Sequence, residues 1–362
     1  MDIVGGRQIA DFTLMQMFPW FGTKKVAQTE ATHMAKMAYA RFTETRDNLY
    51  LEVYTQWYIL STLVQQLHNN RDNLQLLKQL EELALRKVSS SSSGMSSGMG
   101  STAPSMSDVL RVQLEMAEIE NNIESILSEI AAEKAKFNAL LNRPADREVI
   151  LPDSIAKVPF YFDEGVAMSE IENRNPMLDM LVEEEQAYRA KGEMDQKMSY
   201  PMFGIGLQYM LIGESATAQM EQGMEPEMTG MDMIMPMVSI SIPLFRNKYK
   251  AQQRESRFLW QSAREKYDNT LNMLQSDLFR LKHQLDDAER KITLYRKQEQ
   301  LARTTYQLVV QEFVSAKSDL TNVIQVQRQL LDYQLREAEA IAEYNTRVAS
   351  IRKLRSFDKS NN

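Results

Sequence analysis

The residues best suited to chemistry in this sequence are methionines, which are concentrated in the segment GESATAQMEQGMEPEMTGMDMIMPM (213–237). Thioether sulfur is a soft, uncharged ligand that suits Cu(I) or Ag(I). The chain has 24 methionines in all, so a generally high usage of methionine is the alternative explanation. The candidate ligands of a soft metal ion are Met220, Met224, Met228, Met231, Met233 and Met235.

Residues for catalysis or for a cofactor form no recognisable pattern. The chain has no cysteine, which excludes thiolate nucleophiles, cysteine zinc sites and disulfides. Its three histidines, His33, His68 and His283, each fall within a helical pattern, and no nucleophile–base pair or phosphate loop is found. A net charge of −7 without a large basic block argues against nucleic-acid binding. We therefore expect no enzyme activity, no cofactor and no nucleic-acid partner.

Two long helical patterns dominate the chain. Apolar residues in 23–88 and 248–313 recur in alternating steps of four and three. Such a repeat turns one stripe toward a partner helix and gives a left-handed supercoil. Shorter helical patterns follow at 112–140 and 323–351. At 1.5 Å per residue the long helices would reach about 100 Å and the short ones about 50 Å, lengths typical of a tube or stalk.

The two halves of the sequence repeat each other. Pro19 and Ala27 recur as Pro243 and Ala251, at an offset of 224. The first copy carries an insertion, SSSSSGMSSGMGSTAPS, whose Gly and Ser content predicts a flexible turn between its two helices. Each copy is therefore interpreted as strand, long helix, turn and shorter helix, as expected of an internal duplication. Between the copies we expect a helix at about 163–197, with a kink or restart at its Asn-Pro pair.

Short segments beside the long helices alternate in twos, as strands do. The apolar side of this alternation has no evident cover, because the helices already use their apolar stripes on each other. Strands of about ten residues with one apolar and one small or polar side fit a bilayer-spanning barrel, which several copies of the chain would have to build together. The predicted lipid-facing residues are Phe203, Ile205, Leu207, Tyr209, Val238, Ile240 and Ile242.

These residues resemble the TolC-like outer membrane efflux proteins. The resemblance rests on two strand-to-helix junctions, FPWFGTKKVAQTEA and IPLFRNKYKAQQRES, and on FNALLNRP at the end of the first repeat. NRNPMLDML and the Pro-led strand YPMFGIGLQY match a further part of the family pattern. No single motif is specific, but their order and spacing are, and the likeness covers about Phe12 to Leu354.

The resemblance implies a mainly α fold with a transmembrane β portion. Long antiparallel coiled-coil helices would form a periplasmic tube, and the strands would join a trimeric outer-membrane β-barrel. The family works as the exit duct of a tripartite efflux system, a homotrimer in outer membrane lipid with a periplasmic adaptor and an inner-membrane transporter, expected to be proton-driven. The implied segments are barrel strands and an extracellular loop (11–18 and 200–245), a first-repeat hairpin (23–141), a joining equatorial region and helix (142–199), a second-repeat hairpin (246–356) and a tail (357–362).

The sequence departs from the family pattern at its start and at its turns. A signal segment, an anchor cysteine and a first helix and strand are expected before Asp11, so we interpret the chain as lacking its N-terminal part and supplying three strands. In relatives, turn residues ring or lock a narrow aperture, whereas Phe313 here has no hydroxyl group and Ser318 no charge. Ordinary turn residues are the alternative interpretation. The matching positions are Asp108, Arg111, Phe313, Lys317, Ser318, Asn322 and Gln325.

The sequence does not decide which substrate is exported, and two other classes of protein are alternatives. The methionines suggest Cu(I) or Ag(I) export, as in one branch of the family, and drugs are the alternative cargo. A structural coiled-coil protein would explain the heptads, but not the alternating strands and duplicated junctions. A periplasmic adaptor carries one helical hairpin, whereas this chain has two in tandem.

Overall fold

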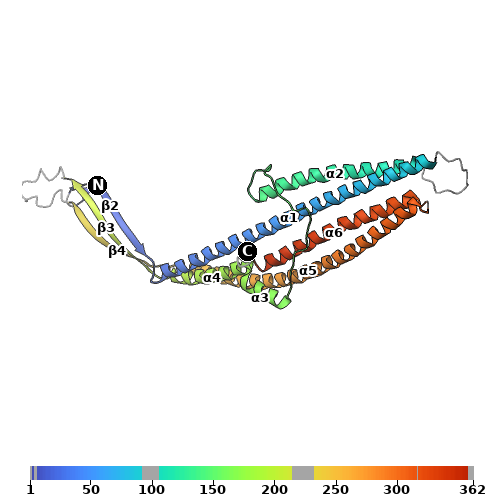
Figure 1. Cartoon of the computed structure of the whole chain (residues 1–362). Coiled ribbons are helices and arrows are strands. Elements are labelled where there is room, and N and C mark those ends of the chain that lie inside the picture. Colours follow the sequence, from blue (N-terminus) through green and yellow to red (C-terminus); the bar gives the residue numbers. More distant parts are fainter. Residues whose placement is uncertain (1, 4–5, 92–105, 214–231, 316, 358–362) are drawn as a thin grey trace, which may run out of the picture. The chain divides into compact units, whose positions relative to one another are not determined.

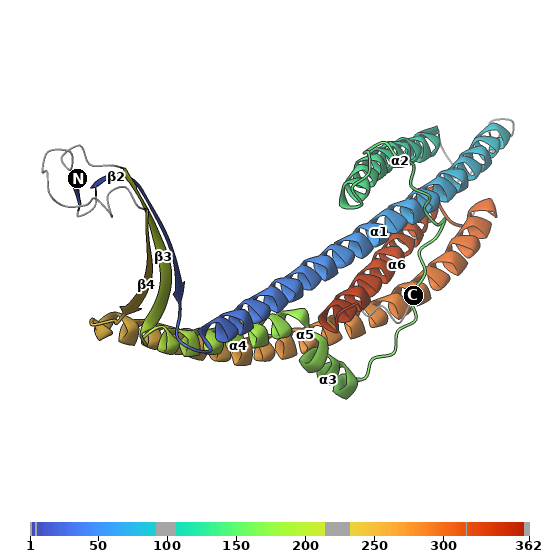
Figure 2. The same cartoon turned by 90° about the vertical axis from the view of Figure 1, so that its left-hand side faces the viewer.

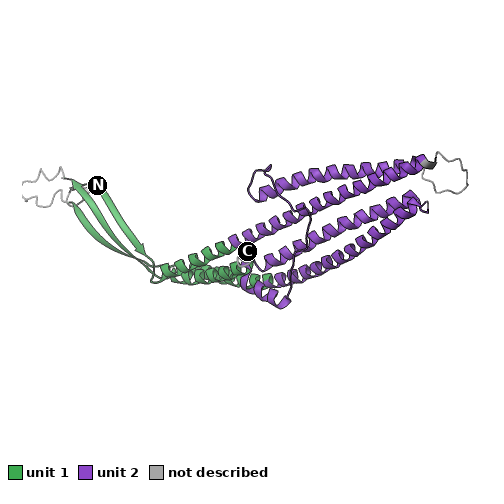
Figure 3. Ribbon diagram, in the orientation of Figure 1, with its two compact units in different colours: residues 1–41, 177–270 green, residues 42–176, 271–362 purple. Residues whose placement is uncertain are grey.

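Six helices and a small antiparallel sheet make up the part of the chain that the computed structural model describes, residues 2–3, 6–91, 106–213, 232–315 and 317–357 (Figure 1). The expected mainly helical fold with a small sheet is confirmed. The chain divides into two compact units (Figure 3). Unit 1 comprises residues 1–41 and 177–270, and unit 2 comprises residues 42–176 and 271–362. The five functional segments expected from the sequence stay a prediction.

The duplication is visible in the lengths of the main helices. Helices α1 (Thr23–Ser91) and α5 (Arg246–Val314) have 69 residues each. Helices α2 (Met106–Leu140) and α6 (Leu320–Leu354) have 35 residues each. Since the helices of the two copies are equal in length, the length difference between the copies falls in the connections. Figures 1 and 2 show α2 beside α1 and α6 beside α5.

The core of unit 2 consists of the apolar stripes that the heptads predict. Leu63, Leu77 and Val112 are buried with residues of α5 and α6 in one cluster. This packing uses the a and d positions of each helix, which explains why helices of this length are stable. No helix within the described residues has an apolar stretch long enough to cross a lipid bilayer.

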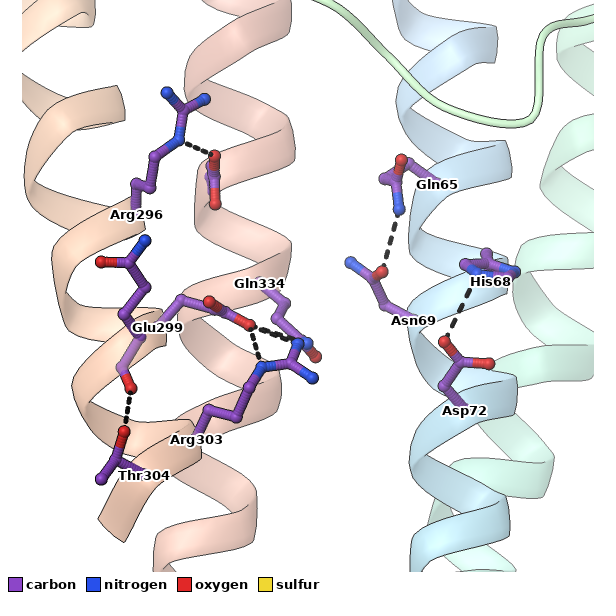
Figure 4. A network of polar contacts seen from close by, with 11 residues as sticks. Gln65, His68, Asn69, Asp72, Arg296, Glu299, Arg303, Thr304 and Gln334 are labelled. Atoms are coloured by element: carbon purple, nitrogen blue, oxygen red, sulfur yellow. Dashed lines mark hydrogen bonds and ion pairs between the residues drawn. The ribbon is translucent and has the colours of Figure 1, made fainter. Parts of the chain in front are cut away.

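Polar groups bridge the helices of unit 2 along the same stripes. The Gln327 amide on α6 donates to the Asn73 amide oxygen on α1, and both side chains are buried. Buried polar pairs of this kind fix the register of coiled coils. Between α5 and α6, the Arg296 guanidinium donates to Glu337 at 3.0 Å. Figure 4 shows a second such bond, from the Gln334 amide of α6 to Glu299 of α5.

The joining region holds two short helices, α3 (Glu164–Arg174) and α4 (Pro176–Lys197). Asn175 separates them in an extended conformation, because the residue before proline is excluded from the helical region. The buried Asn175 amide donates to the carbonyl of Leu354 at 2.9 Å, within unit 2. The expected restart at Asn175-Pro176 is therefore observed.

In unit 1, α4 lies between the N-terminal parts of α1 and of α5. His33 of α1 contacts Glu183 of α4 at 2.6 Å. On the other side of α4, the Trp260 indole of α5 donates to Glu185 at 2.9 Å. Polar contacts from both neighbours thus hold α4 in place.

The sheet of unit 1 has the order β1-β2-β3-β4 and is antiparallel throughout. Its strands are β1 (Asp2–Ile3), β2 (Gly6–Phe18), β3 (Met202–Gly213) and β4 (Met233–Ser241). β2 begins five residues before the expected residue 11, and the two-residue β1 was not expected. The sequence pattern did not predict the earlier start of β2, because the strand register shifts between Gln8 and Ala10 and interrupts the alternation of side chains.

Candidate membrane-facing and aperture sites

The three long strands of unit 1 divide their side chains between two chemically different faces. Residues directly opposite one another in an antiparallel pair lie on the same face, so the register fixes each face. Leu14, Leu207 and Pro236, for example, form one row across the sheet. The resulting apolar face carries Phe12, Leu14, Phe18, Phe203, Ile205, Leu207, Tyr209, Ile234, Val238 and Ile240, with Gln16 as its polar exception.

This apolar face is largely exposed to solvent in a single chain. Ile205 is 63% exposed and Val238 79%. Leu207, Ile240 and Ile242 are exposed as well, and Ile242 lies one residue beyond β4, whereas Phe203 and Tyr209 are half-buried. A continuous apolar surface on this scale marks an interaction site with another protein or a membrane. That the surface faces lipid stays a prediction.

The opposite face of the sheet is made of small, polar and thioether side chains. Gly204 and Gly206 are its backbone-only positions on β3. On this face the Gln208 amide donates to Asp11 at 2.7 Å. The two faces thus differ as a lipid-facing and a water-facing surface of a barrel would.

An aromatic cluster lies where the strands meet the helices of unit 1. The Trp20 ring lies 5.4 Å from the Tyr200 ring and 6.0 Å from the Phe203 ring, between centroids. Gly22 follows with a φ of 79°, and Thr23 starts α1 by donating its hydroxyl to the Trp20 carbonyl at 2.7 Å. Tryptophan and tyrosine concentrate at membrane–water interfaces, so the Trp and Tyr residues beside the strands could have indicated this cluster from the sequence. The sequence analysis missed this cluster.

At the turn end of unit 2, the predicted aperture residues Asp108 and Arg111 are brought together. Asp108 lies in the first turn of α2, where a carboxylate is favoured by the positive end of the helix dipole. The Arg111 guanidinium lies 3.9 Å from Asp108 and donates to the Thr321 hydroxyl of α6 at 2.9 Å. Arg111 therefore links the first-repeat helix to the second-repeat helix.

Phe313, another predicted aperture residue, lies inside the protein. Its side chain is 1% exposed, so its ring belongs to the core of unit 2. The Lys87 ammonium of α1 lies 4.5 Å from the ring centroid and donates to the Phe313 carbonyl. Partial burial lowers the pKa of the Lys87 amine. Lys87 thereby satisfies a carbonyl group at the C-terminal end of α5.

The remaining predicted aperture residues form the turn into α6. Asp319 is the N-cap of this helix and accepts from the Asn322 backbone amide at 2.9 Å. The Asn322 side chain donates to the Ser318 hydroxyl at 3.2 Å. The cap itself is Asp319, the Asn322 and Ser318 side chains are bonded to each other beside it, and Lys317 and Gln325 are exposed. Their place at an aperture stays a prediction.

A salt bridge that the sequence analysis missed lies close to this turn. The Arg328 guanidinium of α6 donates two hydrogen bonds to the Glu115 carboxylate of α2, one of them at 2.8 Å. Glu115 is largely buried beneath Arg328. The heptad pattern places both residues off the apolar stripe, but sequence alone does not give the alignment of α2 against α6.

The predicted metal ligands fall mostly in a part of the chain that is not described. Met220, Met224, Met228 and Met231 lie outside the described residues. Met233 and Met235 lie on β4. Within the described ranges, no three His, Cys, Asp or Glu side chains are arranged to hold a metal ion.

Solved structures with the same fold are outer membrane channels. The chain aligns with VceC of Vibrio cholerae, an outer membrane protein, at a TM-score of 0.77 and 15% identity, over 96% of this chain and 79% of that one. CusC, a protein whose structures concern transmembrane channel formation, aligns with a TM-score of 0.75 and 11% identity, over 96% of this chain and 77% of CusC. The CmeC outer membrane channel of Campylobacter jejuni aligns with a TM-score of 0.71 and 11% identity, over 97% of this chain and 73% of CmeC. Identities this low establish the fold alone.

The family model for outer membrane efflux proteins matches residues 167–355, more than half of the 362 residues. No curated protein sequence matches the chain. Members of the family are efflux channels of the bacterial outer membrane that extend into the periplasm. The chain belongs to the outer membrane efflux protein family.

Proposed function

We propose that this protein is the passive exit duct of a tripartite efflux system. Three copies share one outer-membrane barrel, and their helices enclose a water-filled passage through the periplasm. An inner-membrane transporter, proton-driven, supplies the energy through a periplasmic adaptor. Family membership supports the channel class, and the sheet supports the sharing of strands between chains.

The single observation that carries the proposal is a sheet with two open edges and an uncovered apolar face. β4 pairs only with β3, and β2 beyond Arg7 pairs only with β3, among the described strands. Open backbone edges cannot remain unpaired in lipid, where each unsatisfied group costs several kcal/mol. If β4 of one chain pairs with the strand at the opposite, N-terminal edge of the next chain's sheet, the backbone groups of both edges are hydrogen-bonded and the sheets close into a barrel.

The helical hairpins supply the wall of the duct. In unit 2 the heptad stripe of each long helix packs against neighbouring helices. Helix α5 also carries a second row of apolar residues, which is exposed. Leu294, Leu301 and Leu308 follow one another at steps of seven, and each is about half exposed. A second heptad stripe on the same helix is what a neighbouring chain in the tube wall requires.

The test is assembly followed by conductance. The protein is extracted from membranes in detergent, its mass is measured by native mass spectrometry, and it is then added to planar bilayers. We expect recovery in the outer membrane fraction, a mass of three chains and stepwise conductance. A soluble monomer without conductance would support the structural coiled-coil alternative instead.

The aperture is proposed at the turns of unit 2, with Asp108, Arg111, Lys317 and Gln325 nearest the opening. Arg111 and Arg328 hold α2 against α6 there. A change in these contacts is therefore expected to change the conductance of the assembled channel, because the two hairpins must separate for the turn end to widen.

A further inference from the structure

The methionines of the sheet all point to the same side. β2, β3 and β4 contain seven of them, and the strand register places every one on the face opposite the apolar face. They are Met15, Met17, Met202, Met210, Met233, Met235 and Met237.

A generally high usage of methionine does not explain this one-sided distribution. Methionine used as an apolar residue would occur on the apolar face at least as often as on the polar one. The apolar face is instead built mainly from Phe, Leu, Ile and Val, with no methionine among its members. The sulfur-bearing side chains are thus confined to the face that also carries serine, glycine and glutamine.

Glycines on the middle strand leave room for methionine side chains from both neighbouring strands to lie over it. Met15, Gly206 and Met237 form one row across the sheet. A Cβ atom at Gly206 would lie 3.4 Å from the Met15 Cβ and 3.4 Å from the Met237 methyl group. In the next row, a Cβ atom at Gly204 would lie 2.5 Å from the Met17 sulfur, so this sulfur occupies space that only glycine leaves open.

Two of these sulfur atoms meet at one hydroxyl group. The Ser239 Oγ lies 3.8 Å from the Met15 sulfur and 3.6 Å from the Met17 sulfur. Met237 on β4 lies two residues before Ser239, on the same face. Because methionine side chains are flexible, small rotations bring these thioethers toward a common point.

The charge of this face favours a cation. Asp11 is the only charged residue within 8–18, 202–212 and 233–241. It lies on the methionine face, hydrogen-bonded to Gln208 and to Thr13. A bound monovalent cation would therefore share this face with one carboxylate and with no positively charged side chain from these three ranges.

We propose that Met15, Met17 and Met237 form a site for a soft monovalent cation, Cu(I) or Ag(I), on the water-facing side of the sheet. Thioether ligands select soft ions over hard ones such as Mg²⁺ and Ca²⁺. The position of the site inside the duct rests on the proposed function, whereas the binding itself does not. The site differs from the sequence-predicted ligands, of which only Met233 and Met235 lie on this sheet.

The binding test uses Ag(I), which undergoes no redox change, and the full chain as assembled in detergent, in chloride-free buffer. Ag(I) is counted per chain by equilibrium dialysis, and its ligands are identified by X-ray absorption at the silver edge. The test variant carries Met15→Leu, Met17→Leu and Met237→Leu. A matched control removes three thioethers from three separate helices, through Met116→Leu, Met168→Leu and Met273→Leu. Met and Leu have similar volumes and polarity, so both variants keep the packing.

We expect the sheet variant to bind one Ag(I) per chain fewer than the control variant, with sulfur neighbours lost from the absorption spectrum. Both variants are made in a background in which Met220, Met224, Met228 and Met231 are Leu, so that these residues do not obscure the count. Equal Ag(I) counts in the two variants would overturn the proposal, as would an unaltered protein that binds no Ag(I).

A second variant keeps every sulfur atom and changes only the space around it. A Cβ atom at Gly204 would overlap the Met17 sulfur and the Ser239 hydroxyl, so Gly204→Ala forces both to move. We expect weaker Ag(I) binding with the methionine count unchanged, and unaltered affinity would contradict the site. Since Gly204→Ala removes no methionine, it still tests the Ag(I) site if the triple methionine variant assembles poorly.

Conductance in planar bilayers separates this proposal from the proposed function. A channel that conducts but binds no Ag(I) at the sheet would overturn the metal site and leave the duct intact. A protein that binds Ag(I) at the sheet but neither assembles nor conducts would overturn the duct and leave the metal site.

Discussion

Arg328 of α6 and Glu115 of α2 form a salt bridge with two hydrogen bonds that joins the two repeats near the turn end of unit 2. Arg328 is mostly exposed, so the pair contributes no more than about 1 kcal/mol to the free energy of unfolding. Its geometry nevertheless fixes one hairpin against the other, because a guanidinium and a carboxylate pair in a single plane. For the proposed aperture at this end, we therefore expect the salt bridge to affect channel conductance more than stability.

Glu115→Gln or Arg328→Ala is expected to raise single-channel conductance while lowering the free energy of unfolding only slightly. The exchanged pair Glu115→Arg with Arg328→Glu should return conductance toward that of the unaltered protein. Arg290→Ala is the control, because Arg290 forms its salt bridge with Asp287 within the same helix, α5. If the control variant raised conductance as much as Arg328→Ala, the salt bridge would have no special role at the aperture.

The Asn345 side chain ties the joining region to α6. It accepts from the Val158 backbone amide at 2.8 Å, donates to the Ala156 carbonyl at 2.9 Å, and is 1% exposed. Asn345→Ala leaves two backbone groups without these partners, so we expect a loss of about 1–3 kcal/mol in the free energy of unfolding. Chemical denaturation measures it, with the exposed Asn48→Ala as control. Equal losses in the two variants would contradict this role.

Asp179 of α4 gives unit 1 a pH dependence. Burial, and next the nearby Glu183 carboxylate, raise the pKa of Asp179 above its ordinary value. The folded state therefore binds a proton more readily than the unfolded state, and this contribution to stability is present at low pH and is lost as pH rises through the folded-state pKa. Asp179→Asn should be more stable than the unaltered protein at neutral pH, with the difference shrinking in acid. Denaturation at several pH values measures this, and a difference that grows in acid would contradict the assignment.

The two faces of the sheet should respond oppositely to a positive charge. Val238→Lys places an ammonium group on the apolar face, where lipid contact near the bilayer midplane costs about 2–4 kcal/mol. Gln208→Lys places the same group on the other face, beside Asp11. We expect Val238→Lys to lower the yield of assembled trimer in lipid vesicles and Gln208→Lys to leave it unchanged. Comparable yields would mean that Val238 does not contact lipid.

Much of the fold could be predicted from local pattern. The heptads gave both long helices to within a few residues of their ends, because burial of one stripe governs a long helix. Alternation likewise gave β3 and β4, since a strand has a side-chain period of two. The break at Asn175 followed from the steric restriction before proline. The start of β2 was missed, because the irregularity beside Gln8 breaks the period.

The candidate sites were less predictable because they depend on alignment between distant segments. Nothing in the sequence sets Arg328 opposite Glu115, or Lys87 beside Phe313, until four helices are packed in register. The grouping of Met15, Met17 and Met237 likewise needs the pairing of three strands, two of them separated by about two hundred residues. Residue type identified the thioether chemistry, and only strand register located it.

The absence of cysteine allows the central claim, that neighbouring residues of β4 face lipid and water in turn, to be tested directly. Val238→Cys and Ser239→Cys each introduce a single thiol, on opposite faces of the same strand. The assembled protein in lipid vesicles is treated with a charged maleimide, and labelling is compared with that of the denatured protein. We expect Ser239→Cys to be labelled from the water-filled interior and Val238→Cys to be shielded by lipid until denaturation. Equal labelling, or labelling of Val238→Cys alone, would contradict a membrane-spanning sheet with a wet interior.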